Sequence, residues 1–251
     1  MVPLEATIQP IDPDLDGRAL ADALNSRHDG IKAQQAVELA ARDLFPGRIA
    51  LVSSFGAESA VLLHMVAELD RALPVIFLDS GRLFAETLEY RTRLVDFLRL
   101  EDVRTVTPEP DQLAEEDPHR ALWMTNPDRC CQIRKTLPLQ TAVKDFDAWF
   151  TGRKRFQNAA RAALPLFEAE GPRIKVNPLV SWSHNELKAY AVRQQLPEHP
   201  LVAKGYPSIG CVPCTTRVGA DEDQRSGRWR GLEKTECGIH EPYFETDGSG
   251  I

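Results

Sequence analysis

The sequence lacks any long apolar run, and this absence limits the classes of protein to which it can belong. No stretch approaches the ~20 consecutive apolar residues that a membrane-spanning helix needs. The opening segment, MVPLEATIQPIDPDLDG, also lacks the basic region and the apolar core of a secretory signal. We therefore expect no membrane partner and a cytoplasmic location.

Basic residues are also fewer than acidic ones. The chain has 30 Lys and Arg residues against 37 Asp and Glu residues, which gives a formal net charge of −7. Because an acidic protein repels the phosphate backbone of DNA and RNA, this balance argues against a broad nucleic-acid surface. It leaves room for a local basic pocket.

Cysteine is scarce, with five in 251 residues. A chain of this length buries roughly three quarters of its unfolded surface, so one large α/β domain needs no disulfides to fold. Four of the cysteines form two close pairs, the adjacent Cys130 and Cys131 and the CxxC pair Cys211 and Cys214. In a reducing compartment such pairs indicate metal or redox chemistry rather than structural disulfides.

Three kinds of site are compatible with these four thiols: an iron–sulfur cluster, a structural zinc ion, or a redox dithiol at Cys211 and Cys214. Adjacent ligands are unusual for zinc, and a dithiol would leave Cys130 and Cys131 unexplained. Four inert buried thiols are a further interpretation, against which their clustering argues. Lys135 lies close to the first pair, so its cation could serve both a cluster and a substrate.

Strand and helix patterns alternate along the middle of the chain. Short apolar runs predict strands at 49–54, 73–79, 103–108 and 148–152. Apolar residues three and four apart predict helices at 58–69, at 84–100 and over 20–44, with a break near Asp29 and Gly30. This alternation favours an α/β fold with a doubly wound, mostly parallel sheet, in which ligands bind at the carboxyl ends of the strands.

The two ends of the chain are less regular. Residues 1–15 carry three prolines and are interpreted as an arm. Ser183 and Glu186 have the spacing of a capping box, which predicts a helix from there to about Gln195. From Gly205 onward, eight glycines and no hydrophobic period predict loops and a mobile tail rather than core. The expected parts are an N-terminal arm and helix (1–29), a main domain (30–220) and a C-terminal tail (221–251).

Polar loops follow two of the predicted strands. The first offers hydroxyls and exposed amides at a helix start, which suit a phosphate or sulfate. Its small and hydroxylated residues are Ser53, Ser54, Gly56 and Ser59. An ordinary serine-capped turn is the alternative, and the loop is not a Walker A motif because it lacks the Gly-Lys-Ser/Thr ending. In the second loop, 79–82, Arg82 is expected to pair with a substrate anion or with Glu86.

Cys237 stands apart from the other cysteines, in the predicted tail. A lone accessible thiol is a candidate nucleophile if nearby positive charge lowers its pKa, and an unimportant surface thiol is the alternative. The neighbouring Glu236 acts against such activation. The activating charge must therefore come from the site over which the tail closes or from a basic residue near it: Arg225, Arg228, Lys234 or His240.

Basic residues gather in two short segments of this acidic chain. Thr151–Arg155 reads TGRKR and is followed by Arg161, and Arg225 and Arg228 precede the tail cysteine. Guanidinium groups match the oxygens of phosphate and sulfate, so we expect anion binding, with solvated surface charges as the alternative. His64 and His184 are expected to be structural or surface residues.

Six motifs occur in the order found in the assimilatory sulfonucleotide reductases, and the chain closely resembles that family from about residue 30 to residue 241. The motifs are SSFGAES, LDSGRLF, CCQIRK, TGRKRFQNAAR, GCVPC, and RSGRW followed by ECGIH. The resemblance implies an adenine-nucleotide α-hydrolase-like (PP-loop) fold related to ATP pyrophosphatases. Phe55 and Glu58 depart from the Ser-Gly-Gly-x-Asp-Ser loop of those pyrophosphatases, as they do in the reductases, which argues against ATP cleavage.

Within this family, the CC…CxxC pattern marks the branch that holds a 4Fe–4S cluster and prefers adenosine 5′-phosphosulfate (APS). The resemblance thus implies thioredoxin-dependent reduction of APS to sulfite and AMP, in sulfate assimilation and cysteine biosynthesis. Reduction of 3′-phosphoadenosine 5′-phosphosulfate (PAPS) is the nearest alternative, although the branch acting on PAPS typically lacks both cysteine pairs. An adenylating enzyme of the ATP pyrophosphatase type and a zinc- or cluster-binding interaction module are the others.

The resemblance also assigns roles to residues. Cys237 becomes the nucleophile that forms an S-sulfonate, and thioredoxin then releases sulfite from it. The ligands of one 4Fe–4S cluster per chain become Cys130, Cys131, Cys211 and Cys214. A homo-oligomer is compatible with the sequence. The expected substrate-binding residues are Ser53, Ser54, Phe55, Gly56, Ala57, Glu58, Ser59, Asp79, Ser80, Gly81, Arg82, Lys135, Arg161, Arg225, Arg228 and His240.

Overall fold

The computed structural model describes residues 16–240. The predicted arm at 1–15 and the last part of the predicted tail lie outside the described residues. Among residues 16–240, no helix has the length and apolar character needed to cross a membrane.

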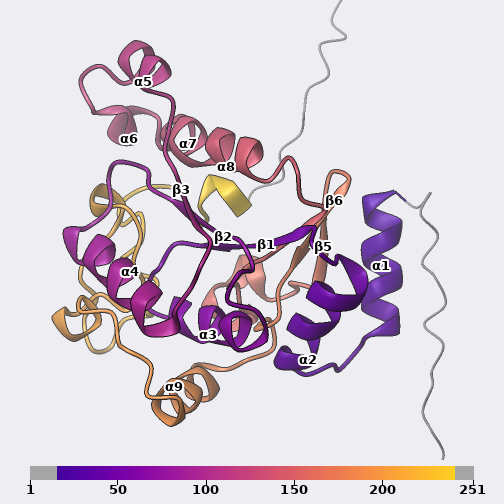
Figure 1. Ribbon diagram of the computed structural model, residues 1–251. Helices are drawn as coiled ribbons and strands as arrows, with labels where there is room; N and C mark the ends of the chain where they lie inside the picture. The colour runs from indigo at the N-terminus through magenta and orange to yellow at the C-terminus, as the bar shows by residue number, and fades with distance from the viewer. Residues whose placement is uncertain (1–15, 241–251) are drawn as a thin grey trace, which may run out of the picture.

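A sheet of six strands forms the centre of the molecule (Figure 1). The strand order is β3-β2-β1-β4-β6-β5, and every neighbouring pair is parallel except the antiparallel β5 and β6. The strands are β1 (Ile49–Ser53), β2 (Val75–Leu78), β3 (Val103–Val106), β4 (Ala148–Phe150), β5 (Phe167–Glu170) and β6 (Arg173–Val176). The first four strands confirm the sequence prediction within a few residues.

The sheet is buried on both faces, as the apolar runs of its central strands require. In β1, Ile49 and Leu51 pack into the larger core, whereas Ala50 packs into a second core on the opposite face. Trp149 of β4 joins Ala50 in that second core, and its neighbour Phe150 joins the first. This two-residue alternation requires a layer of helices on each face.

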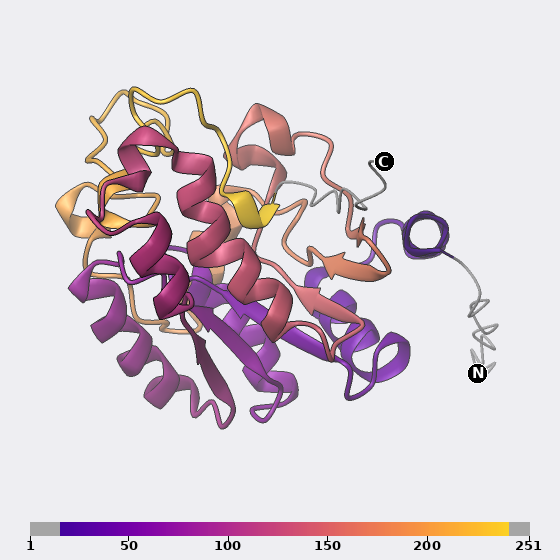
Figure 2. The same ribbon diagram turned by 90° about the horizontal axis from the view of Figure 1, so that it is seen from above.

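Helices supply both layers. Figures 1 and 2 show the α7–α8 segment over one face of the strands and α3 and α4 over the other. The helices are α1 (Gly17–Arg27), α2 (Ala33–Glu38), α3 (Ser59–Leu69), α4 (Ala85–Leu98), α5 (Pro110–Glu116), α6 (Leu122–Thr125), α7 (Pro127–Cys131), α8 (Leu137–Ala142) and α9 (His184–Arg193). The structure thus confirms the doubly wound α/β fold.

Capping explains where α9 begins. The backbone N–H of Glu186 donates to Ser183 Oγ at 3.3 Å, and the backbone N–H of Ser183 donates to Glu186 Oε2 at 2.7 Å. This reciprocal pair is the predicted capping box. The predicted break near Gly30 is also present, between α1 and α2.

The structure corrects the prediction that the chain after Gly205 contributes no core. Residues 205–240 are irregular, but they bury Ile209, Trp229 and Cys237 to less than a tenth exposure. This segment turns back over the carboxyl ends of the strands, so its buried side chains cover the site rather than follow a helical or strand period.

Candidate active site

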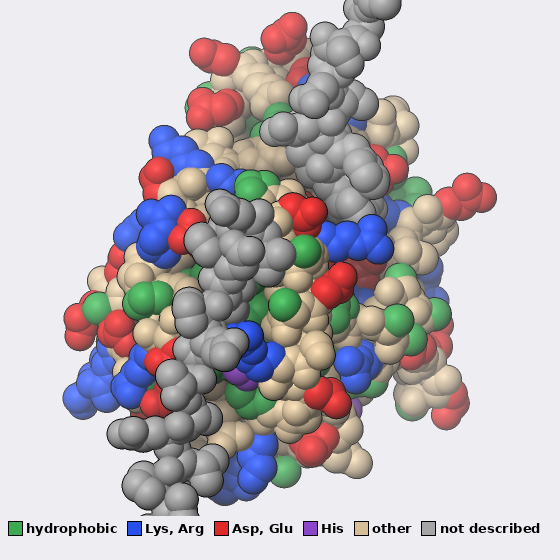
Figure 3. Space-filling model, turned by 90° about the vertical axis from the view of Figure 1, so that its right-hand side faces the viewer, with side chains coloured by type: hydrophobic (Ala, Val, Ile, Leu, Met, Phe, Trp, Pro, Cys, Tyr) green, Lys and Arg blue, Asp and Glu red, His purple; other side chains and the backbone are tan. Residues whose placement is uncertain are grey.

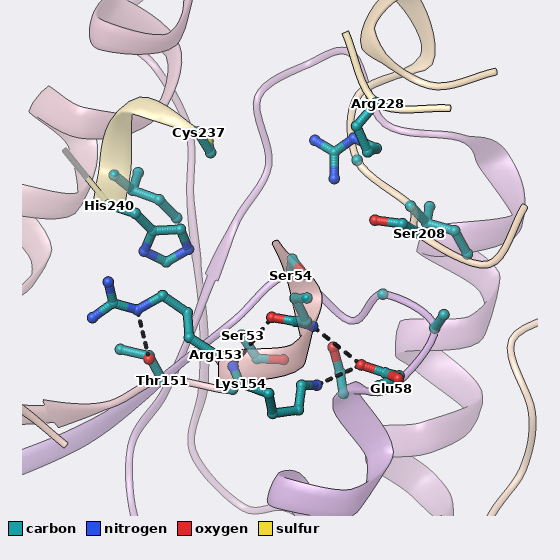
Figure 4. A pocket seen from close by; sticks show the side chains of 18 of the residues that line it. Ser53, Ser54, Glu58, Thr151, Arg153, Lys154, Ser208, Arg228, Cys237 and His240 are labelled. Atoms are coloured by element: carbon teal, nitrogen blue, oxygen red, sulfur yellow. Dashed lines mark hydrogen bonds and ion pairs between the residues drawn. The ribbon is translucent and has the colours of Figure 1, made fainter. Parts of the chain in front are cut away.

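A cavity of about 250 Å³ lies beyond the carboxyl ends of β1 and β4. Figure 4 shows Ser53 and Ser54 at the end of β1 and Thr151–Lys154 after β4, with Cys237 and His240 facing them from the tail. This is the position at which a doubly wound sheet binds ligands. The face in Figure 3 has interspersed basic and acidic side chains, whereas the cavity is lined by several cations.

The loop after β1 lines this cavity with every expected residue except Phe55. Ser53, Ser54, Gly56, Ala57, Glu58 and Ser59 are lining residues. Phe55 has a positive φ of 48° and turns its fully buried ring onto Phe77, edge-on at 5.4 Å between centroids. Phe55 therefore anchors the loop to the sheet.

Glu58 faces the basic segment that follows β4. Its Oε2 accepts a hydrogen bond from Lys154 Nζ at 2.5 Å, and His184 Nδ1 lies 3.3 Å from its Oε1. Burial raises the pKa of Glu58, but the ammonium group of Lys154 outweighs that effect and lowers it below the usual range. Burial lowers the pKa of Lys154, and Glu58 opposes that effect.

The loop after β2 lies elsewhere. Residues 79–82 do not line the main cavity. Arg82 donates to the carbonyl of Arg120 and lies 3.6 Å from Asp117, while Glu86 pairs with Lys204. The expected pairing of Arg82 with Glu86 is therefore wrong.

The four paired cysteines line one small pocket next to the main cavity. Cys130 and Cys131 come from α7, and Cys211 and Cys214 from the loop at 211–214. All four are buried. Ser80 Oγ lies 3.1 Å from Cys211 Sγ, so the loop after β2 reaches the sulfur atoms rather than the main cavity.

Cations surround this cysteine pocket, which is lined by Arg82, Arg134 and Lys135. The Nε atoms of Arg82 and Arg134 are buried there without a hydrogen-bond acceptor. Unpaired donors around four thiols fit a site for an anionic cluster held by thiolates. Within residues 16–240, no three His, Cys, Asp or Glu side chains lie close enough to hold one metal ion.

Cys237 is buried, which corrects the expectation of an accessible thiol. Lys135 Nζ donates toward its Sγ at 3.5 Å. Contact with the Cys131 thiol is the largest influence on the pKa of Cys237, and Lys135 and the backbone N–H of Ile239 add to it. Together they outweigh burial and lower the pKa of Cys237 well below its usual value.

Lys135 lines both the main cavity and the cysteine pocket. Burial lowers its pKa, but the sulfur groups of Cys211, Cys237 and Cys131 outweigh burial and raise it. Its ammonium group therefore stays charged between the sulfur of Cys237 and the four paired cysteines.

The three expected arginines, Arg161, Arg225 and Arg228, line the main cavity, and Arg153 joins them. Arg228 stacks on the ring of Trp229 at 4.3 Å, and Arg225 lies 5.7 Å from the same ring. Burial, followed by repulsion from Arg161 and Arg228, lowers the pKa of Arg225 to about 10, so its cation persists at neutral pH.

His240 faces Arg153 across the cavity (Figure 4). Burial and the surrounding cations, Arg153 first among them, lower the pKa of His240 well below its usual value. The imidazole is therefore neutral at pH 7. Among residues 16–240, its buried Nδ1 has no hydrogen-bond partner.

Several lining residues were not singled out from the sequence, notably Trp149, Ser208 and Ile209. The one available signal was position, because Ser208-Ile-Gly210 directly precedes the CxxC pair. At Gly210 a Cβ atom would come within 2.6 Å of the Arg228 guanidinium carbon, so a larger residue at 210 would displace the end of that side chain.

Comparisons with known proteins agree with this geometry. Residues 48–217 match the phosphoadenosine phosphosulfate reductase domain family. An adenosine 5′-phosphosulfate reductase of Mesorhizobium japonicum is 53% identical over 229 residues, which cover 91% of this chain and 90% of the relative. A Bacillus pumilus protein of the same name is 39% identical over 75% of this chain and 82% of its own.

Solved structures give the same picture. The phosphoadenylyl-sulfate (PAPS) reductase of Candida auris, crystallised as a phosphate complex, aligns with a TM-score of 0.68 and 27% identity. The alignment covers 78% of this chain and 96% of that one. An FMN adenylyltransferase of Candida glabrata has a TM-score of 0.52 at 13% identity over 91% of this chain and 86% of that one, a likeness of fold alone.

Proposed function

The chain belongs to the phosphoadenosine phosphosulfate reductase family, and from that premise we propose that it reduces APS to sulfite and AMP with a thioredoxin as electron donor. One observation carries the proposal: Cys237 Sγ lies 3.5 Å from a charged lysine, at the edge of a cation-lined cavity beyond β1 and β4. A thiol in this setting is a nucleophile for an anionic substrate.

The substrate anion is held by the cations that line the cavity. In this proposal Lys135, Arg225 and Arg228 bind the phosphosulfate group, and the loop Ser53–Ser59 binds the nucleotide. The neutral His240 offers its unpartnered Nδ1 to the same ligand. Both tail arginines lie within fifteen residues of the nucleophile in sequence, so closing the tail brings anion and thiolate together.

The first step is a displacement at sulfur. The Cys237 thiolate attacks the sulfonate sulfur, an S–S bond forms, and the bond from that sulfur to the phosphate oxygen breaks. AMP leaves with the electron pair of the broken bond, and Lys135 and the arginines stabilise the charge that develops on its phosphate. The product on the protein is an S-sulfonate of Cys237.

The second step takes two electrons from thioredoxin. One thioredoxin thiolate attacks Sγ of Cys237 and displaces sulfite, and its second thiol then forms the thioredoxin disulfide and releases the Cys237 thiolate. Because Cys237 is buried in the closed tail, this step requires the tail to open.

We also propose that the cysteine pocket holds one 4Fe–4S cluster, with Cys130, Cys131, Cys211 and Cys214 as ligands. The common pocket and the two unpaired arginine Nε donors support this assignment. When bound, such a cluster supplies fixed negative charge beside Lys135. Lys135 itself stabilises the thiolate and the leaving phosphate.

The Cys237→Ser variant tests the nucleophile. Wild-type protein incubated with APS and no thioredoxin should gain one SO₃ group in its intact mass, whereas the variant should bind AMP and gain nothing. Substantial sulfite production by the variant would contradict the assignment.

The choice of substrate needs its own comparison. We expect a higher kcat/KM for APS than for PAPS, because the two cysteine pairs are those of the APS branch. A preference for PAPS would leave the family and the nucleophile in place and remove the substrate assignment.

A further inference from the structure

Glu236, the residue directly before the proposed nucleophile, forms an ion pair with the guanidinium group of Arg161, which lines the cavity. Glu236 accepts hydrogen bonds from Arg161 Nε and Nη2, both at 2.6 Å, with its two carboxylate oxygens. Asn158 Nδ2 donates to the same carboxylate at 2.6 Å, and Arg225 lies 3.8 Å away. This is the two-pronged geometry with which arginine also binds phosphate and sulfate.

Arg161 has little left to offer a ligand in this state. Its third nitrogen, Nη1, donates to the side chain of Gln157, so all three nitrogens are engaged within the protein. The side chains of Arg161 and Glu236 are only 8% and 13% exposed, so solvent screens the pair little. Glu236 also lines the cavity, where its charge opposes that of an entering anion.

The tail is held at a second point, also on the N-terminal side of Cys237. Lys234 forms an ion pair with Asp128 of α7, the helix that carries Cys130 and Cys131. At Gly238 a Cβ atom would lie 3.2 Å from the Cys131 side chain, which shows how closely the tail packs there. The ion pairs to α7 and to Arg161 therefore both lie just before Cys237, and Gly238 packs on Cys131 just after it.

We propose that Glu236 is a positioning residue for Cys237: its carboxylate holds the tail closed by occupying Arg161, and an anionic ligand competes with it for that guanidinium. The inference rests on the proposed function for the importance of Cys237, but the contact itself does not. By linkage, an anion that takes Arg161 weakens the Glu236 contact, and that contact weakens anion binding at Arg161 to the same degree.

Glu236→Gln tests the inference, with Glu233→Gln as the matched control. Gln keeps the size of the side chain and removes its charge, and the exposed Glu233 lies on the same tail three residues earlier. Two readouts are made on anaerobically purified protein. One is the rate at which iodoacetamide alkylates Cys237, followed by peptide mass spectrometry without ligand. The other is the affinity for AMP, measured by calorimetry.

We expect Glu236→Gln to speed alkylation by about tenfold or more, because a charge-assisted hydrogen-bond pair no longer closes the tail. AMP should bind about threefold tighter or better, because its phosphate no longer competes with a carboxylate. Glu233→Gln should match the wild type in both. An unchanged alkylation rate would overturn the closure role, and an unchanged or weaker AMP affinity would overturn the competition. If the wild type does not bind AMP, the proposed function fails, while the alkylation rates still decide whether Glu236 closes the tail.

Discussion

Lys135 is the residue on which the proposed chemistry depends most. Its Nζ lies 3.5 Å from Cys237 Sγ, and the residue lines both the main cavity and the cysteine pocket. Lys135→Met should slow S-sulfonate formation by about 100-fold or more, because the cation no longer stabilises the thiolate and the leaving phosphate. Single-turnover mass spectrometry with APS measures this rate. Lys204→Met, at an exposed lysine paired with Glu86, is the control and should behave as the wild type.

His199 makes folding sensitive to acid. It is fully buried, its Nδ1 accepts a hydrogen bond from the backbone N–H of Leu201 at 3.2 Å, and its Nε2 lies 3.1 Å from Thr87 Oγ1. Burial lowers its pKa to about 4, with Glu86 opposing and Arg93 adding to the effect. An unfolded histidine has a pKa of about 6.5. The neutral imidazole therefore stabilises the fold fully above pH 6.5 and progressively less as the pH falls toward 4.

Urea unfolding between pH 7.5 and 4.5 measures this effect. In the wild type the free energy of unfolding should fall more steeply than in His199→Gln, by about one proton, or ~1.4 kcal/mol per pH unit. The total difference amounts to about 3 kcal/mol at most. Parallel pH profiles of the two proteins would contradict this role of His199.

Sequence reasoning anticipates single residues when their chemistry is local and misses them when their partner is distant. The spacing of the four paired cysteines identifies them in the sequence. Lys135 is identified by its nearness to the first pair. Arg82 does not, because Asp117, which it approaches, lies on a segment that only the fold brings close. Glu236 looks unfavourable beside a thiolate in sequence, but in the fold Arg161 neutralises it.

At the scale of elements, the start of α9 gives a direct prediction. Ser183→Ala removes the side-chain oxygen of the capping box and should destabilise the protein by about 1 kcal/mol. Chemical denaturation followed by circular dichroism measures the change. The exposed Ser181, just before the cap, provides the control as Ser181→Ala. Equal losses in both variants would mean that the cap contributes nothing.

The sequence did not reveal β5 and β6, and their composition explains why. β5 reads FEAE, and β6 reads RIKV, so charged residues interrupt both patterns. Lys175 of β6 is nevertheless 1% exposed, because it pairs with Glu170 at 2.5 Å and lies over the Trp149 ring. A buried lysine looks like a loop residue until its partners across the sheet are known.

For the whole molecule, the sequence predicts the fold class better than the closure of the site. Buried parallel strands have an apolar run that is visible without a structure, and β1, β2 and β4 lie where such runs occur. The burial of Trp229 and Cys237 has no such pattern, because it depends on the tail meeting strand ends and α7 that are distant in sequence.

The cysteine pocket joins α7 to the loop at 211–214, about eighty residues later in the chain. A bound cluster therefore acts as a cross-link in the folded protein. Cys211→Ser should lose the iron, about four atoms per chain in the wild type, and should lower the melting temperature. Cys237→Ser is the control, because it makes the same chemical change at a cysteine outside the proposed ligand set.

Iron and sulfide analysis with thermal unfolding, on anaerobically purified proteins, compares these variants. Cys237→Ser should keep its iron and its melting temperature. If the wild type contained zinc and no iron, the cluster assignment would be wrong and a single-ion site would take its place. Iron loss from Cys237→Ser would contradict the assignment of Cys237 as the nucleophile rather than a ligand.

Lys135 lies in the wall between the two pockets, and this position links ligand binding in one pocket to metal binding in the other. In the proposed cluster-bound protein this ammonium group would face both sites, so any effect of the cluster on nucleotide affinity would be matched by an equal effect of the nucleotide on cluster affinity. Oxidative loss of the metal would then reach the nucleotide site as a change in ligand affinity, and a saturating nucleotide would slow that loss. Catalysis and oxygen damage would thus be coupled through a single side chain.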